Sequence, residues 1–152
     1  MKTQRITVRG IIFNDNKMLA QQLKPGSDGK KREYWCTPGG GLEPQESLLE
    51  GLHREMIEET GVAPEIGNLL FIQQYEDVEK EFLEFFFHIK NAADYEAIDL
   101  ASTTHGLLEI EATAFVNPRE YNVLPAFLQT IDIQSHIDGN HPVVISNEMT
   151  RL

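Results

Sequence analysis

The chain has 152 residues, of which 41% are apolar and 24% are charged, values that suit one globular domain spanning residues 1–152. Its formal net charge of −11 repels polyanions at long range, so a duplex nucleic-acid partner is not expected. The first residues contain no signal-peptide apolar stretch and the longest apolar cluster is too short to span a bilayer, so we expect a cytoplasmic protein without a membrane partner.

The N-terminal quarter has the pattern of short strands joined by turns. Arg5–Phe13 alternates and then becomes continuously apolar, which predicts a strand. The turn-forming residues Asn14–Asn16 precede Met18–Leu23, the expected hairpin partner. A polar loop, Lys24–Glu33, leads to a further short strand at Tyr34–Thr37.

A glycine-rich break at Gly39–Gly41 is followed by one long helical pattern. Apolar residues recur with helical spacing within Leu48–Ile57 and form a single stripe. Gly61 is suited to end the helix because glycine adopts the left-handed conformation at low cost. The pattern therefore predicts a helix over about Glu46–Thr60.

Two further strands are expected at Leu69–Tyr75 and Phe82–Ile89, as antiparallel neighbours joined by an acidic turn. The segment Asn91–Gly106 that follows is long and irregular. Long loops of this kind often carry specificity, so we expect it to border the substrate pocket and to close over it. A surface excursion without a function is the equally weighted alternative.

The C-terminal third predicts one strand, one helix and a tail. The strand is expected at Ile110–Val116 and the helix near Arg119–Ile131, where apolar residues recur at helical spacing after a proline. Val143–Ile145 in the tail is a candidate edge strand. The order of strands, helix, strands and helix favours an α+β architecture, with a mixed sheet and helices packed on it.

Glu55, Glu58 and Glu59 form the chemically most informative cluster. Their spacing places them on one exposed side of the predicted helix, away from the apolar stripe. Like charges at this spacing destabilise a helix by about 0.2–0.5 kcal/mol per pair, and the helix dipole disfavours anions in the last turns. Local sequence features that disfavour the helix are typical of a functional site. A bound Mg²⁺ or Mn²⁺ would relieve both the charge repulsion and the unfavourable interaction with the helix dipole. A solvated acidic face is the general alternative for such a run.

A larger motif surrounds these acids. Arg54 precedes Glu58 by one helical turn and can pair with it, and Glu46 lies where the helix dipole favours a carboxylate. The spacing Gly-x5-Glu-x7-Arg-Glu-U-x-Glu-Glu-x-Gly-U, with U an aliphatic residue and Met56 a permissive fit, resembles the box of the Nudix family. The match has no gap and consists of Gly40, Glu46, Arg54, Glu55, Met56, Glu58, Glu59, Gly61 and Val62.

The resemblance implies a Nudix-type α/β/α sandwich with a mixed β-sheet and a catalytic loop-helix. It also implies a Mg²⁺- or Mn²⁺-dependent pyrophosphohydrolase, which cleaves a phosphoanhydride of a nucleoside diphosphate linked to another group X. That substrate would be a nucleotide, a nucleotide sugar or a related small molecule. By position, the carboxylates of Glu55, Glu58 and Glu59 and the carbonyl of Gly39 would bind the metal, and Arg54 would orient the glutamates.

The base that activates water is left open, since it is a box glutamate in some relatives and a downstream acid in others. Glu109 is the downstream candidate that joins Arg54 and the box glutamates as catalytic, and Glu111 is its neighbour. A catalytically inactive nucleotide-binding or regulatory module is the alternative function, and a calcium-binding surface is a third. The intact acids favour the enzyme, because degenerate modules typically lose one or more of them.

The sequence does not indicate the identity of X or the oligomeric state, and a homodimer stays compatible with it. Cys36, the single cysteine, is expected to be a small buried hydrophobe. His105 in the long loop is a weaker candidate for approaching the substrate. Several strand aromatics could stack on a base, although core packing is their more common role; they are Tyr34, Trp35, Tyr75, Phe82 and Phe86.

Overall fold

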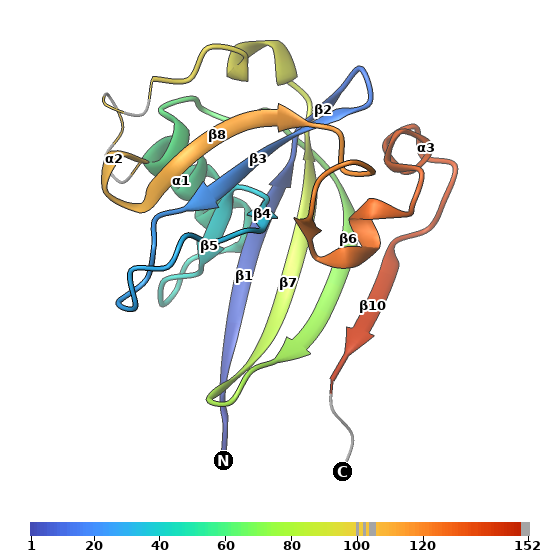
Figure 1. The fold of residues 1–152 in the computed structure, drawn as a ribbon. Coiled ribbons are helices and arrows are strands. Elements are labelled where there is room, and N and C mark those ends of the chain that lie inside the picture. The colour runs from blue at the N-terminus through green and yellow to red at the C-terminus, as the bar shows by residue number, and fades with distance from the viewer. Residues whose placement is uncertain (100, 102, 104–105, 150–152) are drawn as a thin grey trace.

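The computed structural model describes residues 1–99, 101, 103 and 106–149. Within these residues, two five-stranded sheets form the centre of the molecule (Figure 1). The larger sheet has the order β10 (Val144–Glu148), β6 (Ile66–Glu76), β7 (Lys80–Ile89), β1 (Thr3–Ile11) and β5 (Gly39–Gly41). It is mixed, because β1 is parallel to β7 and β10 to β6, whereas β6–β7 and β1–β5 are antiparallel.

The second sheet contains the predicted N-terminal hairpin, formed by β2 (Phe13–Asn14) and β3 (Lys17–Leu23). Its other members are β4 (Trp35–Cys36), β9 (Val123–Leu124) and β8 (Ile110–Val116), the last of which pairs antiparallel with β3. The β3–β8 pair crosses in front of the larger sheet in Figure 1. The two sheets therefore lie one in front of the other in this view.

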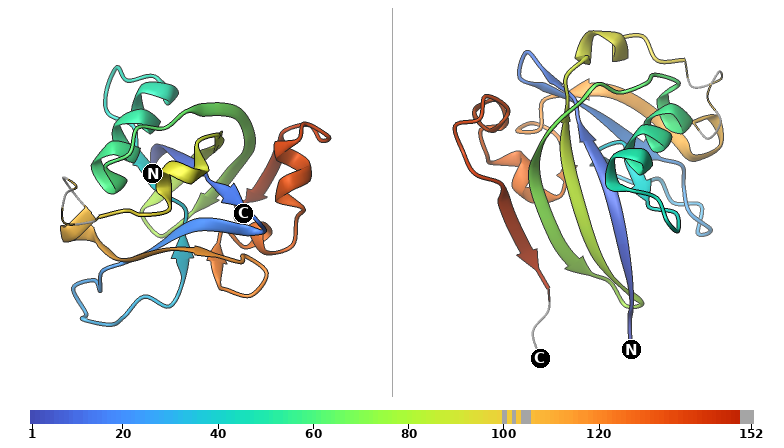
Figure 2. Two further views of the ribbon diagram at one scale, coloured as in Figure 1. Left: turned by 90° about the horizontal axis from the view of Figure 1, so that it is seen from above. Right: turned by 180° about the vertical axis from the view of Figure 1, so that it is seen from behind.

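The helix α1 spans Leu48–Thr60 and confirms the predicted helix, although it starts after Glu46 and not at it. Ser47 caps the helix, because its side chain accepts a 3.1 Å hydrogen bond from the N–H of Glu50. Gly61 ends it at φ 76°, in the left-handed conformation expected for a glycine at this position. Seen from behind, α1 lies beside β1 (Figure 2), and it packs on β1 and β5.

Two apolar clusters hold α1 and the two sheets together. One joins Leu52 and Met56 of α1 to Val8 and other residues of the larger sheet. The other brings Phe86 of the larger sheet against Met18 of the second sheet. Because burial of these side chains drives the packing, the apolar stripe of α1 is fixed against the sheet. The mixed sheets with flanking helices confirm the expected α+β class.

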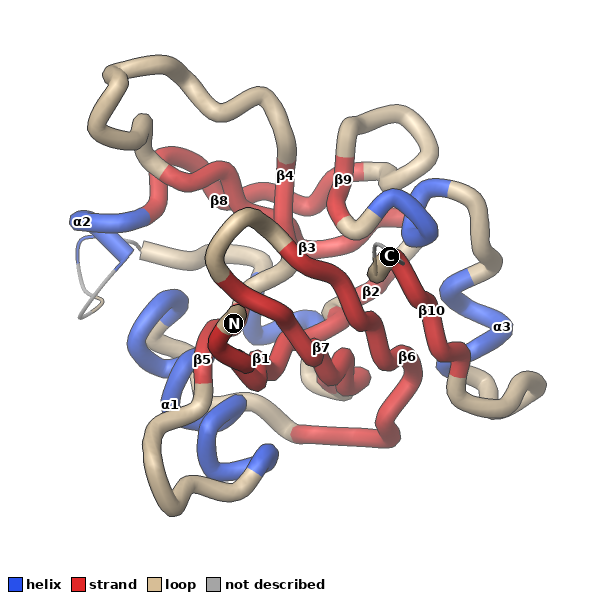
Figure 3. The backbone as a smooth tube through the Cα atoms, turned by 90° about the horizontal axis from the view of Figure 1, so that it is seen from below, coloured by secondary structure: helices blue, strands red, loops and turns tan. Residues whose placement is uncertain are grey.

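The helix predicted near Arg119–Ile131 is wrong. The chain instead forms β9, the 3₁₀ helix η3 (Ala126–Gln129) and the five-residue helix α3 (Ile133–Ile137). Pro125 lies inside the predicted helix, and a proline there lacks the N–H donor and clashes with the preceding turn. The edge strand expected in the tail is confirmed as β10. Figure 3 shows α1 and α3 on opposite flanks of the central strands.

The segment between β7 and β8 contains the 3₁₀ helix η1 (Ala92–Tyr95) and the short helix α2 (Gly106–Glu109). Tyr95 is buried, and its hydroxyl donates a 3.0 Å hydrogen bond to the Val62 carbonyl just beyond α1. The candidate His105 lies outside the described residues. In the part of the chain that the structure describes, no helix is long and apolar enough to cross a membrane.

Candidate functional site

The glycine strand β5 lies against the acidic side of α1. Gly39 has φ 139°, and a Cβ at this position would lie 2.0 Å from the Val8 carbonyl oxygen, so no other residue fits. Its N–H donates a 3.0 Å hydrogen bond to Oε2 of Glu59. At Gly40, a Cβ would lie 2.7 Å from the Glu55 carboxylate. The lack of side chains in β5 therefore lets two acids of the motif approach its backbone.

Arg54 connects the loop before α1 with two acids on the helix. Its Nε and Nη2 atoms lie 2.7 and 2.9 Å from the two carboxylate oxygens of Glu46, which makes a bidentate pair. Its Nη1 lies 3.0 Å from Glu55 and 3.1 Å from Glu58, and its Nη2 donates to the Gly41 carbonyl at 3.1 Å. The expected pair with Glu58 is present, and the guanidinium fixes the position of three carboxylates.

The electrostatics of the acids differ sharply along this network. The hydrogen bonds from Arg54, with help from a backbone N–H, lower the pKa of Glu46 to about 2. Burial raises the pKa of Glu59 to about 8, because its side chain is only 6% exposed. Burial also raises the pKa of Glu55. The expectation of an exposed acidic side is therefore wrong for Glu59, since the backbone of β5 covers it.

A second arginine, Arg9 on β1, also contacts the glycine strand β5. Its Nε lies 3.0 Å from Oε2 of the buried Glu84 on β7, which also accepts a 2.8 Å hydrogen bond from the Thr7 hydroxyl. Its Nη1 donates to the carbonyls of Thr37 at 3.0 Å and Gly39 at 3.4 Å. The guanidinium is thus held in place beside the glycine strand.

The glycine strand, Arg9, Arg54 and the three acids of α1 line one pocket of about 630 Å³. Gln21 contributes a buried side chain that is 1% exposed, and among the described residues its Nε2 has no hydrogen-bond partner. An unsatisfied buried donor favours a ligand that brings an acceptor oxygen. Groups of both charges line the pocket: the carboxylates are those of Glu43, Glu55, Glu58, Glu59 and Glu109, and the guanidinium groups are those of Arg5, Arg9 and Arg54.

The structure distinguishes between the two downstream candidates for the general base. Glu109, at the end of α2, lines the pocket, whereas Glu111 is exposed on β8 and is not among its lining residues. The long loop predicted at Asn91–Gly106 contributes none of its described residues before α2 to this pocket. Residues 100, 102, 104 and 105 of that loop lie outside the described residues, so its predicted closure over the substrate stays a prediction.

The metal ligands implied by the resemblance are not preassembled. In the described ranges, no group of three or more His, Cys, Asp or Glu side chains is placed to hold a metal ion. Each candidate is held by a protein donor, because Arg54 binds Glu55 and Glu58 while the Gly39 N–H binds Glu59. The carboxylate oxygens that line the pocket nonetheless suit a hard divalent cation. Burial disfavours the negative charge on two of these carboxylates, those of Glu55 and Glu59.

The sequence patterns do not single out Arg5, Arg9 and Gln21. The two arginines have one usable signal, because they alternate with Thr7 in a predicted strand and so share a polar face. Gln21 has no comparable signal within its strand. Cys36 is half-buried, and its thiol donates to the Gln21 carbonyl at 3.4 Å, which agrees with a packing role.

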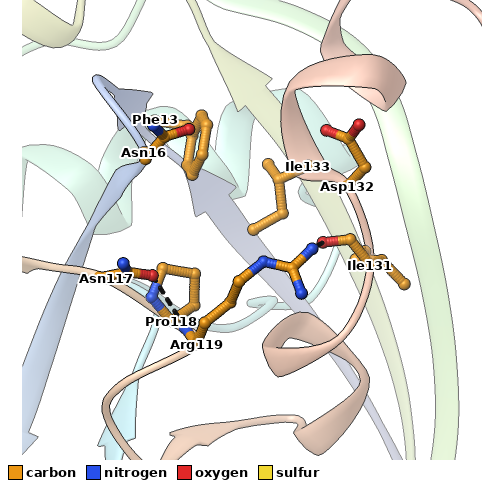
Figure 4. Close-up of a pocket in the computed structure, with 8 residues that line it drawn as sticks. All are labelled: Phe13, Asn16, Asn117, Pro118, Arg119, Ile131, Asp132 and Ile133. Atoms are coloured by element: carbon orange, nitrogen blue, oxygen red, sulfur yellow. Dashed lines mark hydrogen bonds between the residues drawn. The ribbon is translucent and has the colours of Figure 1, made fainter.

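Another cavity, of about 390 Å³, lies between the β2–β3 turn and the segment that follows β8 (Figure 4). Arg119 crosses it and donates to the Ile131 carbonyl at 3.2 Å. Asn117, which also lines it, accepts a 3.0 Å hydrogen bond from the Arg119 N–H. None of its lining residues belongs to α1 or β5, so it is separate from the acidic pocket.

Comparison with known proteins identifies a family model and several relatives that this chain matches. The model of the NUDIX domain matches residues 3–132. The mouse protein named nucleoside diphosphate-linked moiety X motif 6 is 36% identical over 74 residues, 47% of this chain and 22% of that protein. An ADP-ribose pyrophosphatase of Methanocaldococcus jannaschii is 35% identical over 72 residues, 47% of this chain and 41% of the relative.

This chain therefore spans less than half of the length of both curated relatives. A solved structure, the solution structure of the E. coli ORF135 protein, is 22% identical and superposes with a TM-score of 0.68. That likeness covers 93% of this chain and 95% of the other, and it extends the shared fold to nearly the whole molecule.

Proposed function

This chain belongs to the Nudix family, whose domain it matches over residues 3–132, and we propose that it is a Mg²⁺-dependent pyrophosphohydrolase. The family and the relative named as a pyrophosphatase make it a hydrolase that acts on acid anhydrides. The proposed substrate is a small nucleoside diphosphate linked to another group X. Hydrolysis would cleave the anhydride between the two phosphorus atoms and release a nucleotide and phosphorylated X.

The observation that carries the proposal is one pocket lined by both carboxylates and guanidinium groups. A diphosphate needs N–H donors for its nonbridging oxygens. Arg5, Arg9 and Gln21 are among the lining residues of the pocket, and their guanidinium and amide groups are proposed to supply such donors. Because Nε2 of Gln21 is buried without a partner in the described structure, a phosphate oxygen would relieve the cost of its burial.

The proposed metal would be held by Glu55, Glu58 and Glu59 together with the Gly39 carbonyl. Bound Mg²⁺ or Mn²⁺ would neutralise the anhydride oxygens and acidify a bound water. Arg54 keeps two of these carboxylates in the pocket through its Nη1 contacts and is itself held by Glu46. Arg54 is therefore proposed to position the acids.

An inactive nucleotide-binding or regulatory module is the second candidate function. It would use the same cationic donors and would need no proton transfer. The presence of all three acids on α1, together with Glu109 on the pocket wall, favours turnover. The two functions differ in products and not in affinity.

The test is a panel of ADP-ribose, nucleotide sugars and dinucleoside polyphosphates, incubated with Mg²⁺, with Mn²⁺ and with excess chelator. We expect phosphate-bearing products from at least one substrate, loss of activity with chelator and recovery on adding metal. Full activity in excess chelator would contradict the metal mechanism. Tight binding of the panel without any product under all conditions would instead support the inactive module.

A further inference from the structure

A second cavity opens directly beside the acidic pocket, between the two sheets. Its volume is about 450 Å³, within the range of small-molecule sites. It shares the lining residues Arg9, Leu23 and Cys36 with the acidic pocket, so the two cavities are direct neighbours. A ligand with its phosphates beside α1 can therefore extend a further group into this second cavity, which we call the side cavity.

The walls of the side cavity suit a flat heterocycle. Tyr75 and Phe86 line it from the larger sheet, and Tyr34, Leu124 and Pro125 line it from the second sheet or its ends. The ring of Tyr75 is fixed, because it stacks on a neighbouring strand aromatic with the ring centroids 4.6 Å apart and an interplanar angle of 5°. Flat apolar walls of this kind favour an aromatic ring between them.

Two lining residues of the side cavity, Glu84 and Gln73, belong to one polar row on the larger sheet. Strand register places Thr7, Glu84, Gln73 and Ser146 next to one another on β1, β7, β6 and β10. The Glu84 carboxylate already accepts from Thr7 and Arg9. Gln73 is 4% exposed, and its Oε1 has no hydrogen-bond partner among the residues that the structure describes. The row therefore contains a buried acceptor that lacks a donor.

The strand β10 adds a second acceptor beside this one. Glu148 is paired with Tyr75 in the strand register, and its Oε2 lies 3.5 Å from Nε2 of Gln73. Both residues line the side cavity. Glu148 lies beyond residue 132, where the match to the NUDIX domain ends, so it is not part of the family's shared segment.

We propose that Gln73 and Glu148 are specificity-determining residues, which read the N–H donors of a nucleobase that carries an exocyclic amino group. Adenine, cytosine and guanine present such donors, whereas uracil has no amino group and carries a carbonyl oxygen where cytosine has its amino group, so that N3–H is the one donor on its pairing edge. A carbonyl that faces two acceptors leaves all of them unpaired, and this discriminates against the wrong base. The assignment of the base to a substrate rests on the proposed hydrolysis, but binding of the base does not.

The test measures binding of AMP, CMP, GMP and UMP by calorimetry without metal, so that it does not depend on turnover. The wild-type protein should bind the three amino-bearing nucleotides at least about tenfold more tightly than UMP, as expected for hydrogen bonds to a charged acceptor. Glu148→Gln replaces an acceptor oxygen by a donor and should bring this ratio toward one. Gln73→Met removes the buried acceptor at similar size and should do the same.

Glu79→Gln, in the exposed turn between β6 and β7, is the matched control and should leave the ratio unchanged. Thermal melting identifies any variant that does not fold. Equal affinity for all four nucleotides, or an unchanged ratio in both folded variants, would overturn the proposal. If the ratio behaves as expected but no diphosphate is hydrolysed, the base site stands and the proposed activity fails. With a hydrolysed substrate, Glu148→Gln should raise KM while kcat stays nearly constant.

Discussion

Glu59 and Gly39 are joined by a 3.0 Å hydrogen bond from a backbone N–H to a carboxylate oxygen, although they lie 20 residues apart in the sequence. The bond anchors the last turns of α1 on β5. It depends on the missing side chain at residue 39, because a Cβ there would overlap the Val8 carbonyl. Burial raises the pKa of Glu59, and the hydrogen bond from Gly39 opposes this shift. One glycine thus determines both the position and the electrostatics of this acid.

We predict that Gly39→Ala destabilises the protein severely and abolishes activity. A Cβ at φ 139° would lie 2.0 Å from a backbone oxygen that cannot move away without disturbing β1. The loss of unfolding free energy should exceed about 4 kcal/mol. Gly29→Ala is the matched control, because φ is 70° there and no atom lies within 4 Å of the added Cβ. Its cost should be about 1–2 kcal/mol, as measured by urea unfolding. Equal costs at the two sites would contradict the steric argument.

Arg54→Lys should reduce kcat by about 10–100-fold, the range seen when residues that orient metal ligands are changed. A lysine has one point charge and cannot hold Glu46 in a bidentate pair while also contacting Glu55 and Glu58. Steady-state kinetics with the substrate found in the panel would measure this. Arg119→Lys, which affects an exposed arginine outside the pocket, should keep wild-type kcat. Wild-type turnover in Arg54→Lys would show that a positive charge alone suffices.

Much of the site could be predicted because it is local in the sequence. The acids and Arg54 lie within one helix, and helical spacing alone brings Arg54 to Glu58. The end of α1 at Gly61 follows from backbone preference at one position. Such features depend on neighbours within a few residues, which the sequence displays directly.

Features that depend on distant pairing could not be predicted. The contact of Arg9 with Glu84 joins residues 75 positions apart, and it arises from the parallel pairing of β1 with β7. The burial of Glu59 likewise needs the packing of β5 on α1. The helix expected near Arg119–Ile131 is a different case, because Pro125 is visible in the sequence and argues against a helix there. The prediction gives more weight to the helical spacing of the apolar residues than to this proline.

The stability of the protein should show an acid-dependent contribution from Glu46. Its pKa in the folded protein is lowered from 4.5 to about 2, first by the hydrogen bonds from Arg54. A carboxyl group with a lowered pKa stabilises the folded state above its unfolded pKa, and this stabilisation is lost as the pH falls through the folded value. The difference in urea midpoint between wild type and Glu46→Gln should therefore shrink between about pH 4.5 and pH 2.

Arg54→Met provides the control for this pH dependence. In that background the largest cause of the lowered pKa is gone and only the backbone N–H of Glu43 remains, so the effect of Glu46→Gln on the urea midpoint should depend much less on pH. A difference between wild type and Glu46→Gln that stays constant from pH 7 to pH 2 would contradict the assignment to the Arg54 pair.

Removal of single acids on α1 should separate a metal site from general helix charge. Glu55→Gln, Glu58→Gln and Glu59→Gln should each lower turnover by orders of magnitude, whereas Glu50→Gln, in the exposed first turn, should be nearly silent. Mg²⁺ should raise the melting temperature of the wild type, because a cation that binds only the folded protein stabilises it. This rise should disappear in the first three variants and persist in Glu50→Gln. Equal effects at all four positions would indicate helix charge and not a metal site.

Glu109 and Glu111 provide a test for the general base, because the structure places only the first of them on the pocket wall. A general base contributes about 10²–10⁴-fold to turnover. If Glu109 takes the proton from the attacking water, Glu109→Gln should lower kcat by that factor and flatten the rising limb of the pH–rate profile. KM should change little, since the side chain would act in the transition state and not in binding. Glu111→Gln, two residues away and exposed on β8, should leave both unchanged. Wild-type kcat and pH dependence in Glu109→Gln would move the base to one of the acids on α1.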